Sequence, residues 1–262
     1  MSQVFKVLGS VFAAVLLLKS GHTQARGTVG DVYIKQDKQW QALKLVSIDS
    51  DVPAEPTYHA VMYTPSESKP TLQDVKNLTI QLRHAPLSQA VLSEGWRRLG
   101  NQEVTELERA GYVDYLKHND FNKYADVTGQ KVDELIASAN AKYREAYALS
   151  EQKQFSQALD LYHEALDIFP MFIEAVDNIA FILMDHGQFQ DAINAFDHSL
   201  AISPGATALY YKAQCYTEMR EYQIAMDLFQ QGITQFPEKK AAFEEMVNKL
   251  NQVLESNRGA AQ

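Results

Sequence analysis

The chain has 262 residues, of which 46% are hydrophobic and 22% charged, and its formal net charge is -9. Such a length and composition suit a globular protein of one or two domains with a sizeable core. The acidic balance argues against nucleic acid as a partner, because binding phosphates needs a basic surface, and the single cysteine excludes an internal disulfide.

Residues 1–26 resemble a secretory signal peptide in layout. Lys6 precedes the apolar run 7–18, and the small residues Thr23 and Ala25 suit a cleavage site. The run is too short to span a bilayer, which needs about 20 apolar residues. We predict export, to the periplasm or the cell exterior, with a cytoplasmic protein that buries this segment as the alternative. No membrane span is expected elsewhere.

Residues 27–119 predict a small α+β domain. Runs rich in aromatic and branched residues lie between turns marked by proline, and one run alternates apolar with polar residues. The expected strands cover 32–36, 42–48, 57–63 and 78–82, and a helix is expected over 104–118. We predict three or four antiparallel strands with one or two helices. Residues 120–138 would link this domain to the next and begin the next domain's first helix.

The sequence offers few candidates for catalysis. Its seven histidines lack the spacing of metal ligands, and Cys215 is expected to be a small packing residue. Asp49 and Asp51 suit a solvated turn, and His84 suits a satisfied structural histidine better than a catalytic one. An enzyme would require His59, His84 and one of these aspartates to converge in a cleft. We therefore expect no catalytic residue, no metal and no cofactor.

A repeat with spacings of 34 and 33 residues occupies the second half of the chain. Its recurring positions are Phe155, Phe189 and Tyr222, then Ala158, Ala192 and Ala225, then Tyr162, Phe196 and Phe229, and finally Pro170, Pro204 and Pro237. A further alanine recurs upstream, at Ala146, Ala180 and Ala213. Small residues allow two helices to cross closely, and proline ends the second helix. Three consecutive units of this period indicate a solenoid of helix pairs.

The pattern resembles the tetratricopeptide repeat (TPR). The resemblance implies two antiparallel helices, A and B, in each of the units 139–172, 173–205 and 206–238. Gly187 follows helix A of the second unit, where a left-handed cap is wanted. Residues 239–256 predict one amphipathic helix that caps the solenoid. The expected fold is α-rich, a TPR α-solenoid of three repeats and a capping helix, preceded by the small α+β domain.

The resemblance also implies a concave groove lined by the A helices, which would bind a partner peptide or helix. The groove positions are Tyr143, Tyr147, Glu174, Asp177, Asn178, Phe181, Asp185, Tyr210, Tyr211 and Gln214, with Asn140, Glu151, Thr207 and Glu218 beside them. From Lys131 onward the chain has 10 Lys plus Arg and 19 Asp plus Glu. An aromatic surface with an acidic margin predicts a basic or amphipathic protein partner. The alternative is that some of these aromatic residues pack between repeats.

One known mode of TPR binding does not fit these residues. The carboxylate clamp of co-chaperones holds an acidic C-terminal tail with five residues, three of them cationic. The corresponding positions here are Tyr143, Tyr147, Asn178, Thr207 and Tyr211. Without cations, such a site could not offset the desolvation of two carboxylates, so we expect no binding of chaperone tails.

These observations favour a non-enzymatic adaptor or scaffold that binds a partner protein in the TPR groove. The alternative is an enzyme with its catalytic site in residues 27–128, in which the repeats recruit the substrate. Self-association through an edge of the solenoid is a third possibility.

Overall fold

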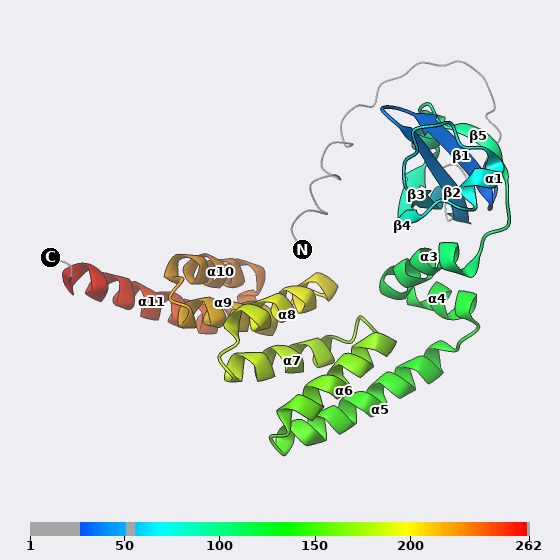
Figure 1. Cartoon of the computed structure of the whole chain (residues 1–262). Coiled ribbons are helices and arrows are strands. Elements are labelled where there is room, and N and C mark those ends of the chain that lie inside the picture. The colour runs from blue at the N-terminus through cyan, green and yellow to red at the C-terminus, as the bar shows by residue number, and fades with distance from the viewer. Residues whose placement is uncertain (1–26, 51–55, 261–262) are drawn as a thin grey trace. The chain divides into compact units, whose positions relative to one another are not determined.

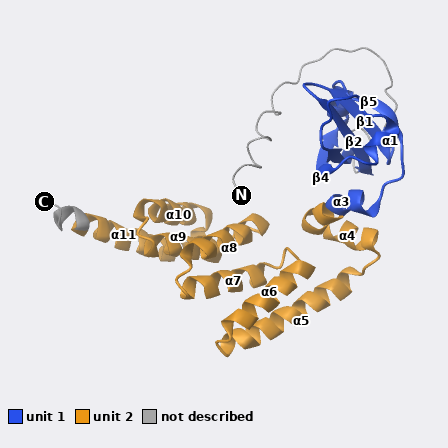
Figure 2. Cartoon of the chain, in the orientation of Figure 1, with its two compact units in different colours: residues 1–112 blue, residues 113–262 orange. Residues whose placement is uncertain are grey.

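The structure, a computed structural model, describes residues 27–50 and 56–260. The signal-like segment 1–26 and Asp51 lie outside the described residues. The chain divides into two compact units, residues 1–112 and 113–262 (Figure 2). Among the described helices, none is both long enough and apolar enough to cross a membrane.

The first unit is built on an antiparallel sheet of five strands in the order β4-β3-β2-β1-β5 (Figure 1). Its strands are β1 (Asp31–Gln36), β2 (Trp40–Asp49), β3 (Thr57–Tyr63), β4 (Ile80–Ser88) and β5 (Arg97–Asn101). The short helices α1 (Leu72–Val75) and α2 (Gln89–Ser93) precede and follow β4. The α+β prediction is confirmed, but β5 was missed, because its sequence RRLGN lacks the branched and aromatic residues that indicate a strand.

The two faces of the sheet are buried differently. On one face, Tyr33, Leu43, Leu45 and Tyr58 form an apolar cluster with Leu92 of α2. The opposite face holds buried polar side chains and contacts the first turns of α3 (Glu106–Asn119), a helix that starts in the first unit and ends in the second. Period-two alternation separates the two sets of side chains, because successive residues of a strand point to opposite faces.

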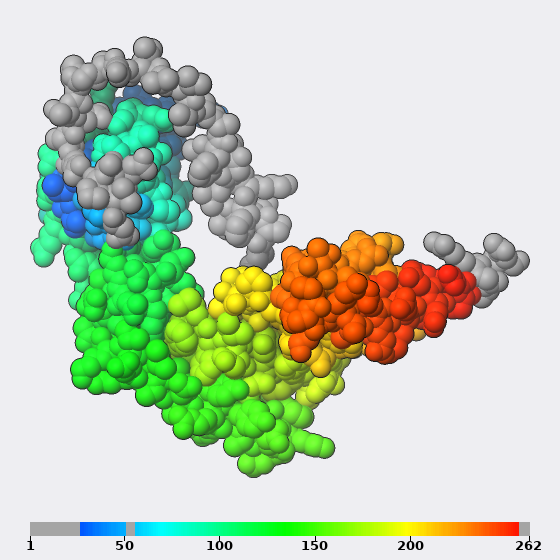
Figure 3. Space-filling view, turned by 180° about the vertical axis from the view of Figure 1, so that it is seen from behind, coloured from blue at the N-terminus to red at the C-terminus, as the bar shows by residue number. Residues whose placement is uncertain are grey.

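The second unit consists of helices (Figure 1). In the space-filling view its surface runs in colour from green through yellow to red, in the order of the sequence (Figure 3). They are α4 (Phe121–Thr128), α5 (Val132–Glu151), α6 (Phe155–Ile168), α7 (Ile173–Asp185), α8 (Phe189–Ile202), α9 (Ala206–Glu218), α10 (Tyr222–Gln235), the 3-10 turn η2 (Pro237–Lys239) and α11 (Lys240–Ala260). The expected linker after residue 119 contains α4. Asp120 caps its start by accepting from the Lys123 amide, and Gly129 ends it in the left-handed region.

The helices pair as A and B through the recurring alanines. All six, from Ala146 to Ala225, are 0% exposed, and so are the aromatic residues Tyr162, Phe196 and Phe229 beside them. The pairs are α5 with α6, α7 with α8 and α9 with α10, and α11 then packs on α10. The predicted fold class, a helical solenoid preceded by a small α+β domain, is confirmed.

The turn after each A helix has one geometry. Gly187 has φ +73°, and the equivalent Lys153 and Arg220 have φ 60° and 62°. In all three turns this residue's amide and the next one donate to carbonyls of the preceding helix turn. The left-handed cap predicted for Gly187 is confirmed, and two non-glycine residues adopt the same conformation.

Candidate functional site

In the first unit, Asp49, His59 and His84 converge beside Tyr112 of α3. Nδ1 of His59 is 2.8 Å from Nε2 of His84, and Nε2 of His59 is 3.3 Å from Oδ2 of Asp49. The Tyr112 hydroxyl donates to Oδ1 of Asp49 at 2.9 Å. Asp49 therefore ends β2 as a partnered residue and does not lie in a solvated turn, which corrects the expectation from the sequence.

This polar chain is covered by an aromatic ring. The Tyr112 ring lies 4.6 Å from that of His59, centroid to centroid, and His59 is 1% exposed. Burial and the neighbouring His59 lower the pKa of His84 to about 4, although Asp49 opposes the shift. One nitrogen must donate and the other accept across the 2.8 Å contact, so the two histidines cannot both be charged in this arrangement.

A second buried polar group fixes α3 to the sheet. Lys44 Nζ lies 2.7 Å from Oε1 of Glu108, which also accepts from the Tyr63 hydroxyl. Burial alone would raise the pKa of Glu108, but these hydrogen bonds outweigh it and hold the pKa below its ordinary value. The sequence contains a signal for this pair: Lys44 interrupts the apolar run 42–46 of β2, where an unpaired charge would be costly.

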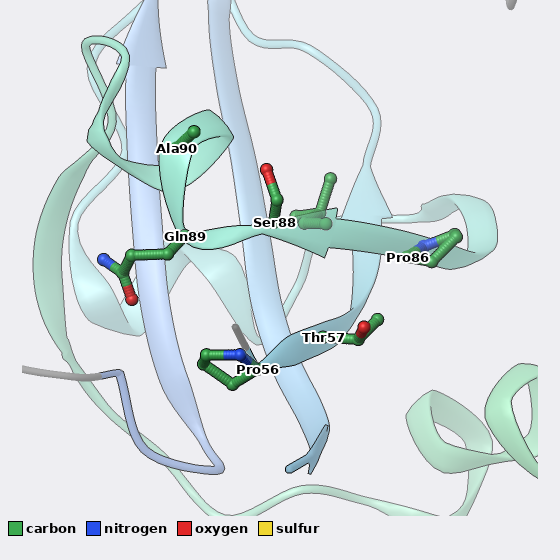
Figure 4. A pocket seen from close by; sticks show the side chains of 7 residues that line it. Pro56, Thr57, Pro86, Ser88, Gln89 and Ala90 are labelled. Carbon is green, nitrogen blue, oxygen red and sulfur yellow. The ribbon is translucent and has the colours of Figure 1, made fainter. Parts of the chain in front are cut away.

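A pocket of about 470 Å³ lies where β3 begins and β4 ends (Figure 4). It is lined by Pro56, Thr57, Pro86, Leu87, Ser88, Gln89 and Ala90. The Gln89 side chain is already engaged, since its Oε1 accepts from the Tyr58 hydroxyl at 2.5 Å. None of these lining residues is a histidine or a carboxylate, so the pocket brings no acid–base group to a ligand.

In the second unit, the predicted groove residues lie on the A helices and differ in exposure. Tyr147 (49% exposed), Glu174 and Asp185 are exposed. The partly buried ones are Tyr143, Asp177, Asn178, Phe181, Tyr210, Tyr211 and Gln214. Of the neighbouring positions, Glu151, Thr207 and Glu218 are exposed and Asn140 is partly buried.

Several of the aromatic residues are engaged in packing between repeats. Tyr143 contacts Phe172, with ring centroids 4.9 Å apart, and its hydroxyl accepts from Asn178 of α7 at 3.1 Å. The Phe181 ring lies 4.8 Å from that of Tyr211 in the next repeat. These contacts join neighbouring repeats.

Tyr210 and Asp177 also face the interior in part. The Tyr210 ring is 5.5 Å from that of Phe229 and 5.6 Å from that of Phe243 in α11. Burial raises the pKa of Asp177, an effect that the Ser199 hydroxyl opposes. Oδ1 of Asp177 is buried and accepts no hydrogen bond from the residues that the structure describes. Tyr147 is thus the exposed aromatic residue of this surface.

A comparison with protein families bears on these helix pairs. Residues 183–250 match the model of the tetratricopeptide repeat. Within that range, the match covers parts of α7 to α11, which show the buried alanines and left-handed turns described above. The helical repeats form a TPR domain.

A curated relative is similar to part of the chain. Over 89 residues the chain is 32% identical to the human protein "Intraflagellar transport protein 88 homolog", a match that spans 32% of this chain and 11% of the relative. The chain therefore corresponds to a small part of that relative's length.

Solved structures of TPR domains are also similar. The Sgt2 TPR domain from Aspergillus fumigatus is 24% identical with a TM-score of 0.42, covering 47% of this chain and 83% of that one. The N-terminal domain of stress-induced protein-1 from C. elegans is 17% identical, with a TM-score of 0.42 and coverages of 45% and 97%. The first TPR of Spaghetti (RPAP3), bound to the HSP90 peptide SRMEEVD, is 15% identical, with a TM-score of 0.41 and coverages of 45% and 94%.

Two hollows lie beside α9 of the TPR domain. The larger, of about 300 Å³, is lined by Met184, Phe189, Gln214, Thr217, Glu218 and Met246. The smaller, of about 190 Å³, is lined by Ala206, Thr207, Tyr210, Tyr211, Lys239, Ala242 and Phe243. Of the residues predicted for the groove, Gln214 and Glu218 line the larger hollow, and Thr207, Tyr210 and Tyr211 line the smaller. The lining residues of α11 were not predicted, because the position of the capping helix depends on tertiary packing.

Proposed function

We propose that this protein is a non-enzymatic adaptor whose TPR domain binds a partner protein or peptide along the A-helix surface. The observation that supports this most directly is the exposure of one aromatic and two acidic side chains on that surface. Tyr147 is 49% exposed, and Glu174 and Asp185 are exposed on α7. Aromatic side chains anchor many protein interfaces because they bury a large area with few rotatable bonds.

The partner that suits this surface is basic or amphipathic. The part of the chain from Lys131 onward has 19 acidic and 10 basic residues, so its field attracts positive segments. An acidic chaperone tail is not proposed, since Tyr143, Thr207 and Tyr211 stand where the clamp needs cations.

The alternative of an enzyme rests on the convergence of Asp49, His59 and His84. Their burial beneath Tyr112 favours a structural role, because a substrate would have to displace the Tyr112 ring to reach His59. None of the residues that line the pocket between β3 and β4 is an acid or a base. We therefore do not propose a catalytic role for the first unit.

The test is a pull-down from the source cell's extract with a groove variant and a matched control. The groove variant combines Tyr147→Ala with Asp185→Lys, two exposed positions on A helices. The control combines Ile224→Ala with Asp160→Lys, an exposed apolar and an exposed acidic position on B helices. Both variants make the same kinds of change. They leave intact the contact of Phe181 with the next repeat and the contact of Tyr210 with α11.

A protein that the wild type and the control capture, and the groove variant loses, supports the proposal. Equal capture by all three would show that the A-helix surface is not the binding site. Circular dichroism of each variant checks that the helices remain folded. An added synthetic peptide with an acidic C-terminus should not compete for the captured protein.

A further inference from the structure

The larger hollow of the TPR domain combines apolar walls with one carboxylate. Met184 of α7, Phe189 of α8 and Met246 of α11 provide the apolar walls, and Glu218 of α9 is the acidic residue among those that line it. Its volume of about 300 Å³ is at the lower limit for ligand pockets, so it suits a side chain better than a cofactor. Methionine side chains adapt readily to the shape of a bound group.

Glu218 stands in an electrostatically unfavourable place. It is the last residue of α9, at the end of the helix where the aligned peptide dipoles leave partial negative charge. No basic residue among the described ones forms an ion pair with its exposed carboxylate. A cation beside Glu218 would neutralise the carboxylate and also interact favourably with the helix end.

We propose that this pocket receives one arginine side chain of a basic partner segment. The proposal rests on the function proposed above and names the group that the partner inserts. The methylene groups of the arginine would contact Met184, Phe189 and Met246, and its guanidinium would pair with the Glu218 carboxylate. The charge of the surrounding domain favours a basic side chain as the occupant of the pocket, because an acidic side chain would be repelled. A purely apolar side chain would leave the charge of Glu218 without a partner.

The probe is a peptide selected from a displayed library of random 12-residue sequences against the full chain. The selected peptide is then labelled, and its affinity is measured by fluorescence anisotropy. We expect selected sequences to share an arginine, and Glu218→Gln to weaken binding about tenfold, as for the loss of one charged hydrogen bond. Replacing that arginine by norleucine should weaken binding to the wild type but not further weaken binding to Glu218→Gln.

The matched control is Glu151→Gln. Glu151 is the exposed last residue of α5, so the control removes the same charge from the same helix position away from the pocket. We expect it to leave the affinity unchanged. A peptide that binds the wild type and Glu218→Gln equally would overturn the proposal of the pocket.

The outcomes also separate this proposal from the proposed function. If binding is lost with Tyr147→Ala and Asp185→Lys but kept with Glu218→Gln, the groove stands and the pocket is wrong. If the selection yields no peptide, both are wrong. If the wild type self-associates in sedimentation and Glu218→Gln does not, the occupant is a second copy of the chain, which also overturns the proposal.

Discussion

At the scale of single residues, the polar chain in the first unit has a definite order. Tyr112 donates to Asp49, Asp49 faces His59, and His59 shares a hydrogen bond with His84. The arrangement connects β2, β3, β4 and α3, which together span residues 40–119. It depends on at least one histidine remaining neutral, and this makes the first unit sensitive to acid.

Lowering the pH should destabilise the first unit. The pKa of His84 falls from 6.5 to about 4 on folding, so the unfolded chain binds a proton more readily between these values. The stabilisation is therefore complete above about pH 6.5 and is lost as the pH falls towards 4. Because His84 is half-buried, solvent screening limits the loss to about 1–2 kcal/mol.

Tryptophan fluorescence in urea measures this effect, since both tryptophans, Trp40 and Trp96, lie in the first unit. We expect His84→Gln to reduce the difference in unfolding free energy between pH 7 and pH 4. The control His118→Gln, at an exposed position, should keep the wild-type difference. An unchanged pH dependence in His84→Gln would contradict the assignment.

At the scale of elements, the turns after the A helices show how one geometry accommodates different residues. Gly187 takes the left-handed conformation without steric cost, whereas Lys153 and Arg220 take it with a Cβ atom. The amide hydrogen bonds of the three turns are equivalent, so the helix end and not the residue type imposes the conformation.

Replacing Lys153 by glycine should therefore stabilise the TPR domain by about 0.5–1 kcal/mol, because the substitution removes the strain of a side chain at positive φ. Gly187→Ala should destabilise the domain by a similar amount. Urea unfolding followed by circular dichroism at the helical band measures both changes. Stabilisation by Gly187→Ala would show that helix propensity dominates at these turns.

At the scale of the whole molecule, α11 completes the solenoid. Phe243 is 1% exposed and lies against Tyr210, Phe229 and Phe236. A Cβ atom on Gly232 would approach the Phe243 ring to 2.1 Å, so this glycine in α10 makes room for the capping helix. Glycine lowers the helix propensity of α10 at this position, but the absence of a side chain allows the close contact with α11.

Phe243→Ala should cost about 3–5 kcal/mol, because it opens a cavity between the last repeat and its cap. Val253→Ala, at a position of α11 that is 37% exposed, should change stability by less than about 0.5 kcal/mol. Thermal unfolding followed by circular dichroism compares the two variants. Equal melting temperatures would show that α11 does not stabilise the repeats.

The repeat, the helix pairs, the capping helix and most of the sheet could be predicted from the amino-acid order alone, because local periodicity and turn residues specify them. The remaining features depend on contacts between distant segments and appear only in the folded chain. Tertiary packing placed Phe181 against Tyr211 of the next repeat and Tyr210 against Phe229 of its own repeat, and it left Tyr147 exposed. It also brought Met246 to the pocket of Glu218. A local pattern shows which face of an element is apolar, but the residue that this face meets depends on how the elements pack.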